Sequence, residues 1–383
     1  MHAPPGSTDA RRMQQSGTVQ LSIVIAPDSF KGSLPAREVA EAIADGWHSV
    51  RPDDTIRSIP QADGGEGTLD AIEAAVTGSV RRDAGLVTGP DGRPVRGEWL
   101  ELPGRVAVVE LAQMCGLPLM KALDPIGATT YGLGQVIRAA LASGARRLVI
   151  GLGGSASTDG GAGALAALGL AAQGGELRAG GLGSIVTLDR SRLLAPPEDV
   201  VLLSDVTNPL LGQNGAAAVY GPQKGARPDQ VESLDAALAR FSGLLGGDPA
   251  QPGAGAAGGT AYGFSTAWGA TIEPGAAYLS TLTGLPDAVA RADLLLTGEG
   301  RFDATSAEGK LVGQLIGLAG EHGVAAGVIA GQLAVPPVDA DGEPLWAASL
   351  AELAGTTEAA MADPARWLRV AGAEAARAVP LAE

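Results

Sequence analysis

Four acidic side chains stand directly after short apolar runs of the sequence, each beside small or polar residues. The runs end in APDSFKGS, PQADGGEG, LSDVTNP and TGEGRFD, which places Asp28, Asp63, Asp205 and Glu299 at equivalent points. Ligands of open parallel sheets bind at the carboxyl ends of the strands, so we expect these carboxylates to share one crevice. Each one alone is also explained as a helix cap or a turn residue. The repetition of one placement favours a functional site.

Lysine is scarce and unevenly placed. The 27 cationic residues include only four lysines, and three of them, Lys31, Lys224 and Lys310, stand beside glycine. A lysine is a compact point charge that suits a flexible phosphate contact. Chance placement on solvated loops explains the same pattern. Lys310 also belongs to TGEGRFDATSAEGK, which combines metal-ligand types with phosphate-neutralising groups such as Arg301 and Asp303.

The segment RLVIGLGGSASTDGGAG joins an apolar run to a glycine-rich loop that opens a helix. Gly153 and Gly154 permit close backbone approach, Ser155 offers a hydroxyl, and the helix start adds amide donors, so the loop predicts a phosphate cradle. The dinucleotide fingerprint holds only with Ala156 in place of its last glycine, which leaves a nicotinamide enzyme open as an alternative. A P-loop is absent, because Leu311 stands where Ser or Thr belongs.

The composition removes several classes of chemistry. One cysteine, Cys115, and three dispersed histidines leave no parts for thiol catalysis, a zinc site or a Ser-His-Asp arrangement. A net charge of −15 argues against nucleic acid or an anionic membrane as partner. No apolar stretch approaches the roughly 20 residues of a membrane span. Residues 1–19 lack an apolar signal core, so we expect a disordered tail and a cytoplasmic, reducing location.

Short apolar runs alternate with longer amphipathic stretches, the pattern of strand–helix units in a mostly parallel sheet. Strands are expected at 21–27, 55–60, 147–151, 200–205, 294–297 and 324–330, and helices at 69–76 and 363–379. The segments EWLEL and RVAVVEL predict antiparallel strands. The Gly- and Ala-rich stretch 243–275 has no clear period, which predicts a linker or an active-site wall.

The length of 383 residues favours two domains. Strand–helix units at both ends of the chain have the same character. We therefore expect a discontinuous, Rossmann-like α/β domain from 20–80 and 286–380, with a doubly wound, mostly parallel sheet. Residues 81–285 would form an inserted α/β domain with a mixed sheet.

Several segments together carry a family resemblance. They are APDSFKGSLPA, PQADGGEGT, DPIGATTYGLG, GLGGSASTDGGAG, SDVTNPLLGQNGAAAVYGPQKGA and LLLTGEGRFDATSAEGK. In order and spacing they resemble the signature segments of the bacterial glycerate kinase family, from about Ile23 to the C-terminal helix. The resemblance implies a catalytic cleft between two α/β domains, ATP as donor, Mg²⁺ as cofactor and D-glycerate as acceptor. It favours 2-phosphoglycerate as the product.

Site roles are expected within this resemblance. Asp205 or Asp63 is the base or orienter of the glycerate hydroxyl, with Lys31 and Lys310 as catalytic cations. Glycerate binding is assigned to Asp28, Ser29, Arg301 and Asn208. Phosphate binding is assigned to Gly153, Gly154, Ser155, Gly64 and Gly65. Mg²⁺ binding is assigned to Glu299 and Asp303, with Asp28 as a further carboxylate on the magnesium side. Two other classes stay open: an oxidoreductase of a small hydroxy acid and a non-catalytic solute-binding protein.

Overall fold

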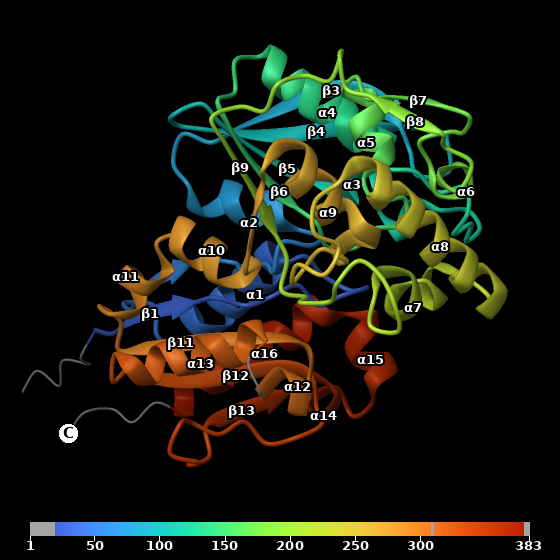
Figure 1. The fold of residues 1–383 in the computed structure, drawn as a ribbon. Coiled ribbons are helices and arrows are strands. Elements are labelled where there is room, and N and C mark those ends of the chain that lie inside the picture. Colours follow the sequence, from blue (N-terminus) through green and yellow to red (C-terminus); the bar gives the residue numbers. More distant parts are fainter. Residues whose placement is uncertain (1–19, 308–309, 379–383) are drawn as a thin grey trace, which may run out of the picture.

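Two α/β lobes make up the protein in the computed structural model, which describes residues 20–307 and 310–378 (Figure 1). One lobe is built on a five-stranded sheet and the other on a six-stranded sheet. We call them the parallel-sheet lobe and the mixed-sheet lobe. They confirm the predicted fold class. The predicted disordered tail, 1–19, lies outside the described residues.

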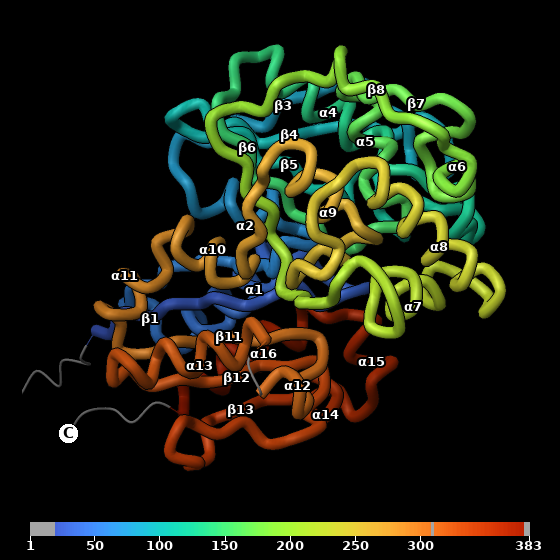
Figure 2. The backbone as a smooth tube through the Cα atoms, in the orientation of Figure 1, coloured from blue at the N-terminus to red at the C-terminus, as the bar shows by residue number. Residues whose placement is uncertain are grey.

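The parallel-sheet lobe takes its strands from both ends of the chain. In spatial order they are β13 (Trp346–Ser349), β12 (Ala325–Leu333), β11 (Leu294–Phe302), β1 (Ser22–Ile25) and β2 (Thr55–Ser58). All neighbours are parallel, and Ile23 of β1 pairs with Leu294 of β11. Figure 2 shows the blue and red ends of the chain side by side in this lobe.

Helices cover both faces of this sheet, because successive strand residues point to opposite sides. Ile23 and Ile25 pack against a layer made of α1 (Ala36–His48), α14 (Leu350–Ala354), α15 (Thr357–Ala362) and α16 (Pro364–Ala378). Val24 and Ala26 pack against α10 (Gly275–Leu282), α11 (Leu285–Val289) and α13 (Leu311–Glu321). The short α12 (Ala304–Ala307) follows β11. The sheet is therefore doubly wound.

The mixed-sheet lobe combines a meander with parallel strands. Its order is β10 (Thr271–Glu273), β9 (Asp199–Leu203), β6 (Arg147–Gly151), β5 (Val106–Glu110), β4 (Pro94–Leu102) and β3 (Val80–Thr88). The pairs β3–β4 and β4–β5 are antiparallel, which confirms the prediction from EWLEL and RVAVVEL, and the others are parallel. A small antiparallel pair, β7 (Ala171–Gln173) and β8 (Thr187–Asp189), lies apart.

Two helical layers enclose the mixed sheet. The larger layer consists of α3 (Leu111–Cys115), α4 (Tyr131–Ala142), α5 (Ala162–Ala167), α6 (Ala179–Leu182), α7 (Ala216–Tyr220), α8 (Pro228–Leu245) and α9 (Ala256–Trp268). The other face meets α2 (Thr68–Ala75), whose Leu69 and Ile72 pack with Leu100 and Val108 of the sheet. Leu279 of α10 joins the same cluster. Helices α2 and α10 thus lie between the sheets.

The stretch 243–275 differs from the linker or wall that its composition predicts. It holds the buried helix α9, interrupted by left-handed residues at Ala257, Gly258 and Gly259. The interruption follows from a close approach, since a Cβ on Gly258 would lie 2.1 Å from the carbonyl oxygen of Ser157. The glycines here are needed for packing.

The predicted domain ranges, 20–80 with 286–380 and 81–285, remain a prediction at the level of their boundaries. Helix α2 precedes residue 80 yet packs on the mixed sheet. In the described ranges, no helix combines the length and the apolar character needed to cross a bilayer.

Candidate active site

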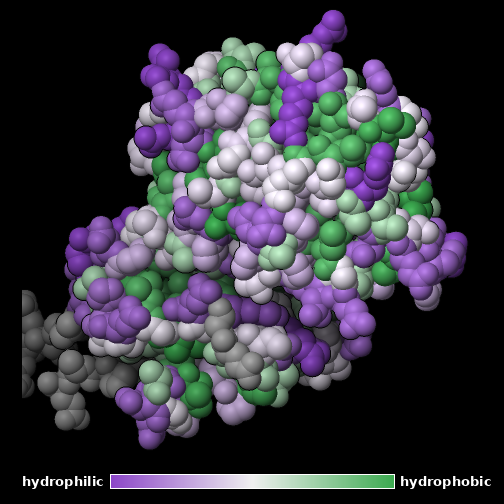
Figure 3. Space-filling model, in the orientation of Figure 1, coloured by the Kyte–Doolittle hydropathy of each residue, from purple (hydrophilic) through white to green (hydrophobic). Residues whose placement is uncertain are grey.

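A cleft of about 840 Å³ lies where the carboxyl ends of parallel strands from both lobes meet. Figure 3 shows hydrophilic residues gathered along the junction of the lobes. The parallel-sheet lobe forms most of the lining, and Asp63 and Asp205 contribute from the mixed-sheet side. This position agrees with the rule that open α/β sheets bind ligands beyond the carboxyl ends of their strands.

The structure brings all four strand-end carboxylates into this cleft. Asp28 and Asp63 follow β1 and β2, Glu299 lies near the end of β11, and Asp205 follows β9. Their positions are held by backbone amides: Ser29 N donates to Asp28 Oδ1 at 2.6 Å, and Gly65 N donates to Asp63 Oδ1 at 3.0 Å. Such short local bonds fix carboxylates that would otherwise rotate freely.

Partial burial raises the pKa of three members of the acidic cluster, Asp28, Asp205 and Glu299. Burial and the neighbouring charge of Asp63 raise the pKa of Asp28 to about 6. Burial also raises the pKa of Asp205, with Asp63 adding to the effect and the amides of Ala276 and Gly275 opposing it. Burial raises the pKa of Glu299 as well. Nearby cations would relieve this accumulation of negative charge.

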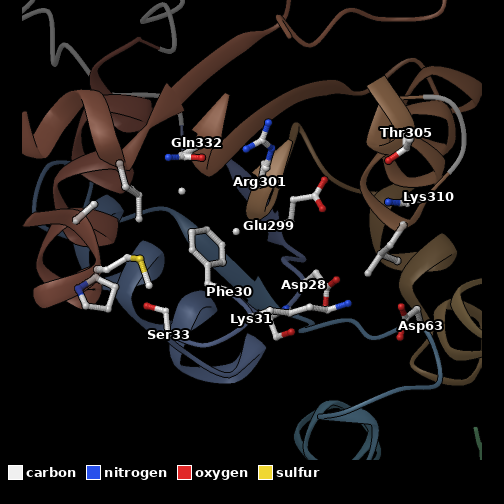
Figure 4. Close-up of a pocket in the computed structure, with 18 of the residues that line it drawn as sticks. Asp28, Phe30, Lys31, Ser33, Asp63, Glu299, Arg301, Thr305, Lys310 and Gln332 are labelled. Atoms are coloured by element: carbon white, nitrogen blue, oxygen red, sulfur yellow. The ribbon is translucent and has the colours of Figure 1, made fainter. Parts of the chain in front are cut away.

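Three exposed cations line the same cleft: Lys31, Arg301 and Lys310 (Figure 4). Lys31 lies in the loop after β1, and Lys310 stands at the start of α13. Among the described residues, the one ion pair of Arg301 is a long contact with Asp303, 3.9 Å between Nε and Oδ2. Their charges are therefore available to an anionic ligand.

Strand β11 extends further than its sequence pattern predicts, and this positions two site residues. Glu299 pairs with Ala330 and Arg301 with Gln332 of β12, where the sequence predicts a loop after Thr297. The extension is stabilised by Phe302, whose side chain is fully buried. Glu299 and Arg301 thus project from the same side of a strand, which is stiffer than a loop.

A divalent cation fits the cleft through few protein ligands. Within residues 20–307 and 310–378, no three His, Cys, Asp or Glu side chains cluster closely enough to form a metal site. However, Glu299 Oε1 is buried and, among the described residues, accepts no hydrogen bond. Mg²⁺ commonly binds through one or two carboxylates plus substrate phosphates. The orphaned oxygen of Glu299 suits that arrangement.

Comparison with known proteins identifies the family to which this chain belongs. The glycerate kinase family, as a sequence model, matches residues 23–380. The chain belongs to the glycerate kinase family. The "Glycerate 2-kinase" of Escherichia coli K12 is 43% identical over 307 residues, which cover 76% of this chain and 80% of that protein. The "Glycerate kinase" of Bacillus subtilis 168 is 43% identical over 305 residues, which cover 76% and 79%.

The family fold extends over nearly the whole chain. A crystal structure from Salmonella typhimurium LT2, described as a glycerate kinase 2, is similar with a TM-score of 0.79. It is 34% identical in sequence, and the match covers 94% of this chain and 98% of that chain. The recognised resemblance is therefore confirmed, and the two-lobed architecture is that of the family.

Several predicted site residues of this family member lie outside the cleft lining. Asn208 is used within its own loop, where it donates to Asn214 O at 2.9 Å and accepts from the Tyr220 hydroxyl at 2.6 Å. Asp303 caps α12, because its Oδ1 accepts hydrogen bonds from Thr305 and Ser306. Their predicted roles in glycerate and Mg²⁺ binding remain predictions, and the local contacts already explain both side chains.

The glycine-rich loops that were assigned to the nucleotide phosphates pack against each other. Gly153 N donates to Gly64 O at 3.1 Å, and a Cβ on Gly153 would lie 2.4 Å from Gly65 Cα. Neither loop lines the cleft, although Gly65 holds Asp63, which does. Their close approach therefore positions a carboxylate of the site.

Ser155 meets a residue whose role the sequence left open. Lys224 is buried, donating from Nζ to Ser155 Oγ at 2.9 Å and to Ser157 O at 2.5 Å. Burial lowers the pKa of Lys224 to about 7, and the charge of Asp159 opposes the shift. This lysine ties the glycine-rich loop to the segment after α7. Its GPQKGA context is compatible with a phosphate contact or with chance placement, and in the structure the ammonium group is used by these two internal hydrogen bonds.

Some cleft residues are absent from the set predicted from the sequence. Gln332 and Thr357 line the cleft and are joined by a 2.6 Å hydrogen bond from Nε2 to Oγ1. The strand-end rule, applied to β12, would have pointed to Gln332. Nothing local distinguishes Thr357 or Met361, which reach the cleft only because α15 packs beside β12.

Proposed function

We propose that this protein transfers the γ-phosphoryl group of ATP to the 2-hydroxyl of D-glycerate, giving 2-phosphoglycerate and ADP. The observation that carries the proposal is the convergence of four carboxylates and three cations in one cleft between two α/β lobes. Phosphoryl transfer depends on positioning and electrostatic stabilisation more than on covalent chemistry from the protein. The relatives named glycerate kinase and glycerate 2-kinase support the same assignment.

The cations divide between the two anionic substrates. Arg301 or Lys31 grips the glycerate carboxylate, which is the only fixed charge on that substrate, and Arg301 can do so with two parallel hydrogen bonds. Lys310 neutralises the charge on the transferred phosphoryl group. Glu299, with help from Asp28, would hold Mg²⁺, and the ion would supply charge neutralisation to the nucleotide phosphates.

Asp205 is the better candidate for the base. Its side chain reaches the open part of the cleft, and the partial desolvation of the carboxyl there raises its pKa, which brings its basicity nearer to the working pH. In the reaction the glycerate oxygen forms the new bond to Pγ, its proton passes to Asp205, and the bond from Pγ to the β-phosphate oxygen breaks. Asp63, held by Gly65, orients the acceptor.

The geometry of glycerate favours the 2-hydroxyl over the 3-hydroxyl as the phosphoryl acceptor. It lies next to the anchored carboxylate, whereas the 3-hydroxyl hangs from a rotatable carbon. A short, rigid path from anchor to base therefore favours the inner oxygen. Neither alternative class is favoured by a contact: the loop that would hold a dinucleotide is packed between Gly65 and Lys224. We expect a cytoplasmic enzyme.

Phosphorus NMR tests the reaction directly. The full chain is incubated with ATP, Mg²⁺ and D-glycerate, with a parallel sample lacking glycerate. We expect 2-phosphoglycerate from the first minutes. A product that is 3-phosphoglycerate from the outset would overturn the regiochemistry, and the absence of any glycerate-dependent ester would overturn the substrate.

A further inference from the structure

One end of the cleft is apolar and takes no part in the chemistry above. It is formed by Phe30, Leu350, Ala360, Met361 and Pro364, from the loop after β1, from α14 and α15, and from the start of α16. We call these five residues the apolar end. In Figure 4 the labelled charged side chains lie to one side of the Phe30 ring.

The apolar end is already packed in the structure. Phe30, Leu350 and Ala360 belong to one buried cluster of the parallel-sheet lobe. Phe30 is further held by paired backbone hydrogen bonds with Leu34, of 2.9 and 3.0 Å. A ligand entering here meets a rigid wall and does not have to order it, which lowers the entropic cost of binding.

We propose that the apolar end binds the adenine ring of the nucleotide, an inference that rests on the proposed kinase function. The two substrates are ATP and D-glycerate. The adenine ring of ATP is the one part of them that is flat and uncharged and has apolar faces, so it gains free energy from burial against these side chains. The triphosphate then extends toward Lys31, Arg301 and Lys310. The nucleotide lies along the parallel-sheet lobe, away from the predicted cradle at Gly153 and Gly154.

Met361 is the most accessible member of the apolar end. Its side chain is 57% exposed on α15, while its neighbour Ala360 is buried beneath it. A single exposed methionine is common on protein surfaces. This one, however, lines a cleft whose other end carries cations that can bind phosphate. A thioether contacts aromatic rings favourably, commonly near the ring edge. Adenine binding would bury this side chain.

Gln332 provides polar recognition beside the apolar end. It lies near the end of β12, and its bond to Thr357 fixes the amide and ties α15 to the sheet. An amide side chain both donates and accepts, the combination that matches the N6 and N7 edge of adenine. The geometry thus supplies an apolar wall together with a polar edge contact, as ligand pockets commonly do.

A methyl NMR titration tests the inference without relying on turnover. The full chain has five methionines, and labelling with [methyl-¹³C]methionine gives one resonance for each. The Met361 resonance is assigned by its loss in Met361→Ala. ADP with Mg²⁺ should shift it through the ring current of the base. Inorganic tripolyphosphate with Mg²⁺ has no base and should leave it in place.

Calorimetry adds a matched comparison of affinities. Met361→Ala should raise the Kd of ADP by about 2- to 10-fold and leave the Kd of tripolyphosphate unchanged. Leu86→Ala should alter neither, since Leu86 is equally apolar, 76% exposed and located on β3 of the other lobe.

The failures are distinguishable. ADP binding with an unmoved Met361 resonance, or an equal shift with tripolyphosphate, would overturn the adenine site and leave the kinase proposal standing. Absence of ADP binding would overturn the proposed function and the adenine site together.

Discussion

Substituting Gly153 by alanine separates two explanations of the glycine-rich loop. The added Cβ would lie 2.4 Å from Gly65 Cα, whereas ordinary contact begins near 3.4 Å, so the two loops must separate by about 1 Å. Backbone atoms cannot rotate away as a side chain can. Overpacking of this kind costs about 1–3 kcal/mol, which lowers Tm by roughly 1–4 °C in a chain of this size. Because Gly65 holds Asp63, the same displacement should lower kcat by about 100-fold.

Thermal unfolding and steady-state kinetics measure both effects in one variant. Gly317→Ala is the matched control, because its added Cβ meets no atom within 4 Å and its position inside α13 favours alanine. Its Tm should be unchanged or slightly higher. If Gly153→Ala keeps the wild-type Tm and kcat and raises only the KM for ATP, the loop is a phosphate cradle and the packing argument is refuted.

Three further predictions concern charged residues. Lys31→Ala and Lys310→Ala should each lower kcat/KM at least 10-fold, while Lys121→Ala, outside the cleft lining, stays within about twofold of wild type; equal effects in steady-state assays would contradict the assignment. Asp205→Asn should lower kcat by roughly 100-fold with an unchanged circular dichroism spectrum, and near-normal turnover would remove Asp205 as base. Burial raises the pKa of Glu110 from 4.5 to about 7, so the stability present below pH 4.5 is lost as pH rises through 7. In urea unfolding, Glu110→Gln should escape this loss, of up to about 3 kcal/mol, and parallel pH profiles would show the reasoning to be wrong.

Local patterns predicted most strands of this fold. The strand expected at 147–151 is β6 itself, because apolar residues there are bounded by arginines and glycines. The limits of β11 were wrong, since Glu299 and Arg301 become strand residues only through pairing with β12. The packing of α2 on the mixed sheet could not be predicted from local sequence either, because it depends on which sheet lies nearest after the chain turns at Gly64.

The candidate site likewise contains residues that local sequence patterns predict and residues that depend on contacts between distant segments. The carboxylates were predictable because a strand end can be recognised locally and parallel strands share one edge. The contact between Gly153 and Gly65, the burial of Lys224 and the position of Met361 each join segments far apart in sequence. Residue type therefore left the role of Lys224 open, and the structure shows that its ammonium group makes internal hydrogen bonds.

The pairing of β1 with β11 has a consequence for how the protein is made. Ile23 finds its partner Leu294 only after some 270 further residues have left the ribosome, which takes roughly 15–55 s at ordinary rates of translation. Until then β1 has β2 alone beside it, and the apolar faces of Ile23 and Ile25 lack α16 as a cover. The mixed-sheet lobe has all its strands before β11 emerges. The nascent chain therefore exposes an apolar N-terminal segment until β11 and α16 have been synthesised. Exposed apolar segments of this kind are bound by chaperones.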